Sequence, residues 1–310
     1  MNIFDLHCDT IGECTNQNLE LFDNPLQLSL KKGEAFSGWC QFFAVWMPDT
    51  KRNAEAFAYF DRVYAYFLTQ MDKNCEYISF CKNAAEISGA LWNQKRVALL
   101  SIEGGGAIGG RIERLREMYV RGVRMMTLTW NGSCELGDGC GVPNAQGLTA
   151  FGRHVVTEME RLGMVIDVSH LSERGFYDVA EETSCPFIAS HSNSRAICEH
   201  PRNLTDEQFR VLVRRSGLVG INLYPEFLGA EKDNGCEMIY RHLCHFLELG
   251  GENTVALGTD FDGAEMPEDL QSVDRLPVLW EYLLKKNLPE KQINKFFFQN
   301  AYDFFHKVLH

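Results

Sequence analysis

The stretch NIFDLHCDT, residues 2–10, joins a short apolar run to a histidine and an aspartate. Its apolar part predicts a short strand over residues 3–6. His7 and Asp9 follow, and residues i and i+2 of an extended backbone point to the same side. An imidazole and a carboxylate that converge in this way can ligate a divalent metal ion. Taken alone, the pair is better explained as a solvated turn after a strand, so the rest of the chain must decide.

Seven further β-like runs follow this one, and helix-like segments separate them. The runs cover residues 39–45, 97–102, 123–129, 164–168, 187–190, 218–222 and 255–259. The expected helices cover residues 54–72, 84–94, 111–120, 148–162, 173–183, 205–215, 236–249, 275–286 and 290–308. Eight strand–helix alternations in 310 residues predict a (β/α)8 barrel, as a single domain over residues 1–310. A doubly wound open sheet is the alternative, because counting strands does not establish closure.

Composition narrows the class of protein. The chain is 45% hydrophobic and 23% charged, which is globular composition. A formal net charge of -12 argues against a nucleic-acid partner, because phosphate binding favours a basic face. The sequence has neither a basic and apolar leader nor about eighteen consecutive apolar residues. We therefore expect a cytoplasmic protein without a membrane partner.

Metal-ligand residue types recur where five of the predicted strands end. These residues are His7 with Asp9, Glu103, His170, His191, and Asp260 with Asp262. In a (β/α)8 barrel the C-terminal strand ends form the rim that carries the active site. Each residue has an ordinary structural explanation, but their joint occurrence at five strand ends favours a site.

Five of these side chains fit a site for two divalent ions: His7, Asp9, Glu103, His170 and His191. Glu103 would bridge the ions. Two ions roughly 3.5–4 Å apart can share a water, lower its pKa and polarise a carbonyl group. Asp260 would then move a proton from that water to a leaving nitrogen.

Residues 104–109, GGGAIG, match the G-x-G-x-x-G fingerprint of dinucleotide-binding enzymes. That fingerprint requires an acidic residue about twenty positions later. The chain instead reads LTWN at residues 128–131, and Glu103 beside the glycines would repel a pyrophosphate. A dehydrogenase is therefore only a remote alternative.

Ordered stretches along nearly the whole chain resemble the membrane (renal) dipeptidases, peptidase family M19 of the amidohydrolase superfamily. The stretches are FDLHCDT (4–10), SIEGG (101–105), GLTAFG (147–152), EMERLGMVIDVSH (158–170), SHSNSR (190–195), HPRN (200–203), GINLYP (220–225) and GTDFDG (258–263). The resemblance implies a (β/α)8 barrel with two zinc ions that hydrolyses dipeptides, including those with a C-terminal D-residue, through a bridging hydroxide. It implies that one ion is held by His7 and Asp9, the other by His170 and His191, and both by Glu103.

The resemblance also implies roles for residues around the ions. Asp260 matches the catalytic acid/base, and Arg202 matches the residue that receives the carboxylate of the substrate. A planar guanidinium suits bidentate binding of a carboxylate. Tyr224 is expected in the substrate pocket. Family members are often dimers, so a homodimer is compatible with the resemblance.

One position departs from the mammalian pattern. Mammalian members carry Leu-Thr-His-Ser after the fourth strand, with the histidine over the substrate, whereas this chain has Trp130 in that place. An indole offers a single N–H donor. N-acyl amino acids or another small amide or lactone are therefore alternative substrates, and a metal-binding homologue without catalysis is the alternative from another class. Manganese and cobalt also accept this ligand set.

Overall fold

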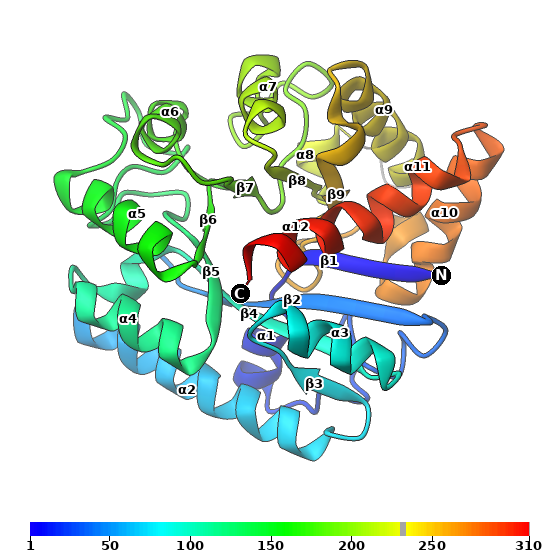
Figure 1. The fold of residues 1–310 in the computed structure, drawn as a ribbon, viewed down its shortest axis with the longest axis horizontal. Helices are drawn as coiled ribbons and strands as arrows, with labels where there is room; N and C mark the ends of the chain where they lie inside the picture. The colour runs from blue at the N-terminus through cyan, green and yellow to red at the C-terminus, as the bar shows by residue number, and fades with distance from the viewer. Residues whose placement is uncertain (230–233, 310) are drawn as a thin grey trace.

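The computed structural model describes residues 1–229 and 234–309, and nine strands of this part form one sheet. All pairings are parallel, and the sheet closes because β2 pairs with both β1 and β4. The predicted (β/α)8 barrel is thus confirmed and the open sheet is excluded (Figure 1). The strands are β1 (Asn2–Cys8), β2 (Gly38–Trp46), β3 (Ile78–Phe80), β4 (Arg96–Glu103), β5 (Val123–Thr127), β6 (Val165–Asp167), β7 (Ile188–Ala189), β8 (Leu218–Ile221) and β9 (Val255–Leu257).

Helices surround this barrel, and α12 crosses one of its ends (Figure 1). Residues that are typical of helix ends begin and end these helices where the sequence predicted. Thr205 begins α7 with a capping box shared with Gln208, and Gly163 ends α5 with a left-handed φ of 75°. The helices are α1 (Thr10–Gln17), α2 (Asn53–Lys73), α3 (Ala84–Trp92), α4 (Ile112–Arg121), α5 (Ala150–Leu162), α6 (Glu173–Glu182), α7 (Asp206–Arg214), α8 (Pro225–Leu228), α9 (Gly235–Glu248), α10 (Leu276–Lys285), α11 (Glu290–Asn294) and α12 (Asn300–Val308).

Three features differ from the sequence-based expectation. The additional strand β3 pairs with the first residues of β4, and β5 pairs with the later residues of the same strand. The short helices α1 and α8 were not expected, because neither is long enough to show a clear helical period. The single helix predicted over 290–308 is interrupted by a π-helical turn, Lys295–Gln299. This turn brings Phe298 to the core inside the barrel, whereas Phe296 and Phe297 remain in the core outside it.

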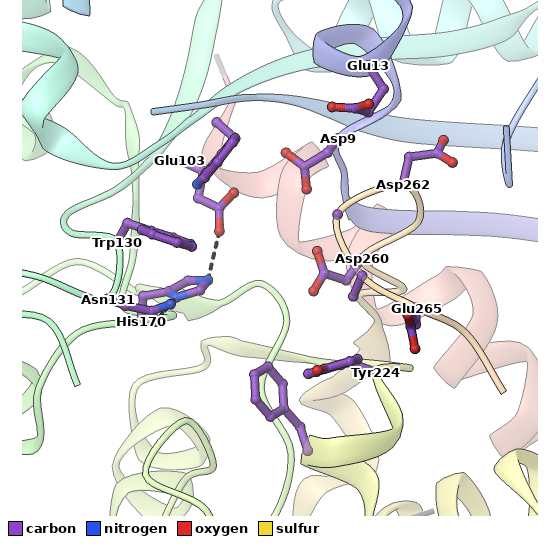
Figure 2. Close-up of a pocket in the computed structure, with 14 residues that line it drawn as sticks. Asp9, Glu13, Glu103, Trp130, Asn131, His170, Tyr224, Asp260, Asp262 and Glu265 are labelled. Atoms are coloured by element: carbon purple, nitrogen blue, oxygen red, sulfur yellow. Dashed lines mark hydrogen bonds and ion pairs between the residues drawn. The ribbon is translucent and has the colours of Figure 1, made fainter. Parts of the chain in front are cut away.

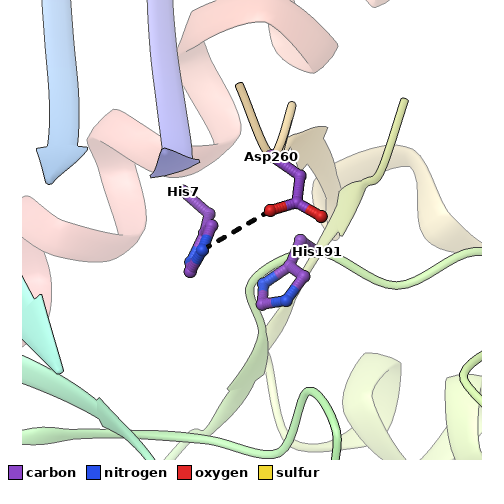
Figure 3. A group of neighbouring side chains, drawn as sticks. All are labelled: His7, His191 and Asp260. Carbon is purple, nitrogen blue, oxygen red and sulfur yellow. Dashed lines mark ion pairs between the residues drawn. The ribbon is translucent and has the colours of Figure 1, made fainter. Parts of the chain in front are cut away.

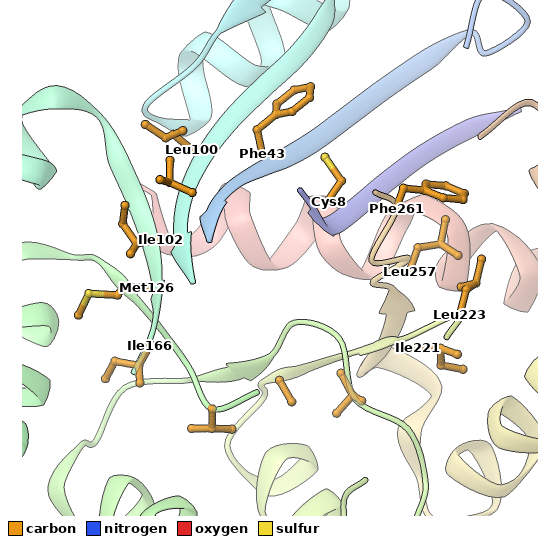
Figure 4. Close-up of a cluster of buried hydrophobic side chains, with 14 of the residues drawn as sticks. Cys8, Phe43, Leu100, Ile102, Met126, Ile166, Ile221, Leu223, Leu257 and Phe261 are labelled. Carbon is orange, nitrogen blue, oxygen red and sulfur yellow. The ribbon is translucent and has the colours of Figure 1, made fainter. Parts of the chain in front are cut away.

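Two hydrophobic cores explain why the strands are apolar on both faces. The core inside the barrel includes Phe4, Phe42 and Leu99. Phe305 closes this core at the end of the barrel that α12 crosses, and the ring centroids of Phe305 and Phe4 are 5.2 Å apart. The core outside it lies between the strands and the helices, and includes Phe43, Leu100, Ile102, Met126, Ile166, Ile221 and Leu257 (Figure 4). On β4, residues 97 and 99 face inward while residues 98, 100 and 102 face outward. The same alternation turns Glu103 into the mouth of the barrel.

A register shift between Asp5 and Cys8 changes the direction of the side chains at the end of β1. Phe4 and Leu6 belong to the inner core, but Cys8 belongs to the outer one. A regular strand would have placed all three on the same face. The irregularity therefore re-aims His7 at the barrel mouth, as β-bulges beside active sites commonly do.

Candidate active site

The structure brings six predicted residues together at the C-terminal mouth of the barrel. Each is at most 8% exposed, and together they come from or follow the ends of five strands, β1, β4, β6, β7 and β9. The residues are His7, Asp9, Glu103, His170, His191 and Asp260. Three overlapping groups of these residues offer ligand atoms within 4.8 Å of one another, so each group could hold a metal ion.

The first group is formed by the end of β1 and Glu103 of β4. His7 Nε2 lies 3.3 Å from Asp9 Oδ2 and 3.5 Å from Glu103 Oε2. Asp9 Oδ1 is buried and has no hydrogen-bond partner among the described residues. A buried carboxylate oxygen without a donor is costly, and a cation would satisfy it.

The second group uses the other oxygen of Glu103. Glu103 Oε1 lies 2.7 Å from His170 Nε2 (Figure 2) and 3.5 Å from His191 Nε2. The two imidazole Nε2 atoms are 2.9 Å apart. One carboxylate therefore faces two separate groups of ligand atoms.

Hydrogen bonds indicate which nitrogens carry hydrogen in the second group. His170 Nδ1 lies 2.8 Å from the amide oxygen of Asn131, which can only accept a hydrogen bond. The hydrogen therefore sits on Nδ1, and Nε2 presents a lone pair toward Glu103 and His191. A lone pair that faces a carboxylate oxygen at 2.7 Å is repelled, whereas a cation bound between the two atoms would be attracted to both. The donor set fits a divalent metal ion.

Electrostatics support the same interpretation. Burial disfavours a charged His7, but Glu103 and Asp9 outweigh this effect and raise its pKa well above the usual value. Burial, with repulsion from Glu103, raises the pKa of Asp9 to about 7. The carboxylates thus attract a proton to His7, and a divalent cation would displace that proton and neutralise them more fully.

The other two histidines are held in the neutral form. Burial and the positive charge of Arg202 lower the pKa of His170 to about 4. Burial, followed by the effect of His7, lowers the pKa of His191 well below its usual value. A neutral imidazole is the form that ligates metal ions.

Asp260 lies on the other side of His7, with 3.7 Å between Asp260 Oδ1 and His7 Nε2 (Figure 3). Its second oxygen accepts a hydrogen bond of 2.9 Å from the amide of Asn222. Burial and repulsion from Glu103 raise the pKa of Asp260 to about 6, against the attraction of His7. The residue occupies a left-handed backbone conformation, with φ of 65°.

Comparison with known proteins identifies the family. The model of the membrane dipeptidase family, peptidase family M19, matches residues 1–309. The chain belongs to this family. Dipeptidase 3 of Macaca fascicularis is 32% identical over 244 residues, which are 73% of this chain and 48% of that protein.

Two solved structures share the whole fold. One is a metallo peptidase from Rhodobacter sphaeroides bound to a phosphinate mimic of the dipeptide L-Ala-D-Ala, with 27% identity, a TM-score of 0.93 and 99% of both chains covered. The other is dipeptidase AC, an M19 metallo peptidase with 28% identity and a TM-score of 0.93, covering 100% of this chain and 99% of that one. As an M19 metallo-dipeptidase the chain is a hydrolase.

Family membership removes the dehydrogenase interpretation of the glycine run. In this M19 dipeptidase, Gly105–Ile108 form a buried 3-10 turn. A Cβ on Gly105 would lie 2.5 Å from the carbonyl oxygen of Leu128. The glycine there permits close packing of the loop after β5.

Among the described residues, every helix is too short or too polar to cross a bilayer.

A cavity of about 490 Å³ opens beside the metal-ligand groups of the M19 dipeptidase. Asp9 and Asp260 line it and lie across from Trp130 (Figure 2). Trp130 packs edge-on against Trp46, with ring centroids 5.2 Å apart. Tyr224 also lines the cavity, and its hydroxyl bonds to Glu226 at 2.9 Å.

Arg202 is set slightly apart from this cavity. It is 5% exposed, and its guanidinium lies 5.2 Å from the ring centroid of Phe227, which lines the cavity. It donates to the carbonyl oxygen of His191 at 3.1 Å and to Ser192 Oγ at 3.3 Å. Its Nε is buried and has no partner among the described residues, so one donor remains available.

Gly263 is a site residue that the sequence suggested only as part of a turn. A Cβ built on it would overlap Asp9 Oδ2 and lie 2.6 Å from Asp260 Oδ1. Both contacts are to carboxylates of the site, so the missing side chain makes room for their convergence.

Gly263→Ala is therefore expected to lower kcat/KM about 100-fold, because small displacements of catalytic groups have effects of that size. Gly89→Ala is the matched control. Nothing lies within 4 Å of a Cβ at Gly89, which is inside α3, so this variant should keep full activity. It should also gain up to about 1 kcal/mol of stability. Wild-type activity in Gly263→Ala would contradict the described convergence of Asp9 and Asp260.

Proposed function

We propose that this protein is a zinc-dependent dipeptidase that holds two cations through a shared carboxylate. His7, Asp9 and Glu103 would hold one ion, and Glu103, His170 and His191 would hold the other. The observation that carries this proposal is Glu103, whose two oxygens face two different sets of ligand atoms. Mixed imidazole and carboxylate ligands are typical of catalytic zinc sites, although manganese and cobalt also accept them.

Two bound cations would supply Lewis-acid chemistry, polarising a carbonyl oxygen and lowering the pKa of a water. Side chains of the protein would carry out the proton transfers. Asp260 borders the cavity and lies on the same side as Asp9, so it can accept a proton from the attacking water. It would return that proton to the nitrogen of the cleaved peptide bond, as a general acid.

The substrate class follows from charge and size. Arg202, whose buried Nε has no partner among the described residues, would receive the C-terminal carboxylate of a short peptide. Trp130 and Tyr224 would contact the substrate side chains. The Rhodobacter sphaeroides relative binds a mimic of L-Ala-D-Ala. We therefore include dipeptides with a C-terminal D-residue among the substrates.

A substrate panel with metal analysis tests this function. We expect two metal ions per chain and hydrolysis of both L-Ala-L-Ala and L-Ala-D-Ala. If only N-acetylated amino acids or other small amides are cleaved, the alternative amidohydrolase function replaces the dipeptidase. Two bound ions without turnover of any of these substrates would indicate a metal-binding homologue without catalysis.

Arg202→Ala should raise KM for dipeptides about 10- to 100-fold, because it removes a hydrogen bond to a charged group. The control is the same dipeptide with a C-terminal amide, which lacks the carboxylate. The variant and the wild type should process this amide equally. An equal loss for both substrates would mean that Arg202 acts only by holding the His191 backbone.

A further inference from the structure

A further buried carboxylate, outside the metal-ligand groups, is linked by hydrogen bonds to one of the histidines. Asp167, at the end of β6, is 0% exposed and points into the barrel between β5 and β7. Its Oδ1 accepts backbone N–H groups from Ser169 and Ser190, each at 2.9 Å. Its Oδ2 accepts the hydroxyls of Thr127 at 2.6 Å and Ser190 at 2.5 Å. None of these hydrogen bonds joins Asp167 directly to a residue of the metal-ligand groups.

Ser190 connects this carboxylate to a ligand. Its Oγ lies 2.7 Å from His191 Nδ1. A serine hydroxyl has one hydrogen, and that hydrogen is donated to Asp167. The contact with His191 can then be a hydrogen bond only if the hydrogen sits on Nδ1 of the imidazole. His191 Nε2 is left with a lone pair, which faces Glu103 and His170.

The arrangement differs from a catalytic triad made of the same residue types. In a triad the carboxylate holds the imidazole, and the imidazole takes the hydrogen of the serine. Here the carboxylate holds the serine, and the serine accepts from the imidazole. Ser190 is also completely buried and does not line the cavity, so it cannot reach a substrate. The chain of hydrogen bonds orients a ligand rather than activating a nucleophile.

We propose that Asp167 and Ser190 are positioning residues that hold His191 as the Nδ1–H tautomer and thereby set the metal affinity of the His170–His191 half of the site. This inference rests on the proposed two-metal function. Groups that orient a metal-ligating histidine commonly change metal affinity 10- to 100-fold when they are removed. In the other half of the site no such hydrogen bond orients the imidazole, because His7 Nδ1 has no partner among the described residues. The effect should therefore be confined to one of the two ions.

Zinc titration of Ser190→Ala against a chromophoric chelator tests the affinity. We expect one of the two ions to bind about 10- to 100-fold more weakly and the other to bind as in the wild type. Thr127→Val is the matched control. Thr127 donates to the same oxygen of Asp167 but does not contact His191, so its loss should leave both affinities unchanged. Equal affinities in the wild type and Ser190→Ala, or equal losses in both variants, would overturn the proposal.

Asp167→Asn should reverse the direction of the hydrogen bonds with Thr127 and Ser190, although asparagine has nearly the same shape as aspartate. The two backbone N–H groups keep an oxygen at the Oδ1 position, so the new amide N–H₂ must face the hydroxyls of Thr127 and Ser190. Ser190 then accepts from the amide and gives its own hydrogen to His191 Nδ1. The imidazole hydrogen is driven to Nε2, where it blocks ligation. This variant should lose affinity for the same ion at least as strongly as Ser190→Ala.

Nitrogen-15 NMR of histidine-labelled, metal-free protein determines the tautomer of His191, and this measurement requires neither bound metal nor catalytic activity. The His191 signal is identified by its absence in His191→Gln. The wild type and Thr127→Val should show hydrogen on Nδ1, and Asp167→Asn should show it on Nε2. An Nε2–H tautomer in the wild type would overturn the inference. This result is independent of the substrate panel, so the failure of the dipeptidase function and the failure of the tautomer inference are distinguishable.

Discussion

Asp260→Asn is expected to lower kcat for dipeptides by about 10²- to 10⁴-fold, which is the usual contribution of a general acid–base residue. The protein should retain two metal ions. Asparagine has nearly the same shape as aspartate but cannot take up the proton of the attacking water. It is also one of the few residues that tolerate the left-handed backbone found at this position, where φ is 65°. The substitution therefore removes the proton acceptor with little strain.

The adjacent turn provides a matched control, Asp262→Asn. Asp262 has a φ of 67° and borders the same cavity. Its oxygens, however, accept hydrogen bonds from the Thr10 hydroxyl at 2.5 Å and from the backbone N–H of Gln27 at 2.7 Å. This variant should be less stable but keep most of kcat.

Metal analysis of Asp260→Asn decides what Asp260 does. His7, His191 and Asp260 also form a group that could hold an ion. A variant that loses both turnover and one ion would show that Asp260 is a ligand. A variant with full turnover would remove Asp260 from the reaction altogether.

Glu103→Gln is expected to reduce the bound metal from two ions to at most one per chain. It should also lower kcat at least about 100-fold, which exceeds the loss typical of residues that only hold a metal ligand in place. Glu103 Oε2 faces His7 at 3.5 Å, and Glu103 Oε1 faces His170 at 2.7 Å. Glutamine offers one oxygen and one N–H₂ group, so it can serve only one side. The other ion would meet a hydrogen-bond donor instead of a negative charge.

Glu158→Gln controls for the loss of a buried glutamate. Glu158 is 5% exposed, and its carboxylate is paired with Arg116 and Arg161, each at 2.7 Å. Removing that charge should lower the melting temperature and leave the metal content unchanged. Two tightly bound ions in Glu103→Gln would contradict the shared role of Glu103.

The sequence predicted most of the barrel because strand and helix periods are local properties. All eight barrel strands occur where short apolar runs were expected, and Thr205 and Gly163 bound their helices as their residue types indicate. The strand β3 was missed because its three residues are too few to show a period. The break in the last helix was missed because nothing in its local sequence requires a π-helical turn.

The site was predictable as a set of residue types and not as a network. His7, Glu103, His170 and His191 stand at strand ends, which a linear pattern reveals. Their partners do not follow from any pattern. Asn131 holds His170 across 39 positions, and Asn222 holds Asp260 across 38.

The sequence by itself determined which reactive side chains stand at the strand ends, because the end of a strand is encoded locally. Tertiary structure alone decided how these side chains are held. The shift in β1 that turns His7 inward, the space left by Gly263, and the hydrogen bonds from Asp167 through Ser190 to His191 all depend on barrel closure. Closure brings distant strands within hydrogen-bond distance, and the orientation of each ligand is set there.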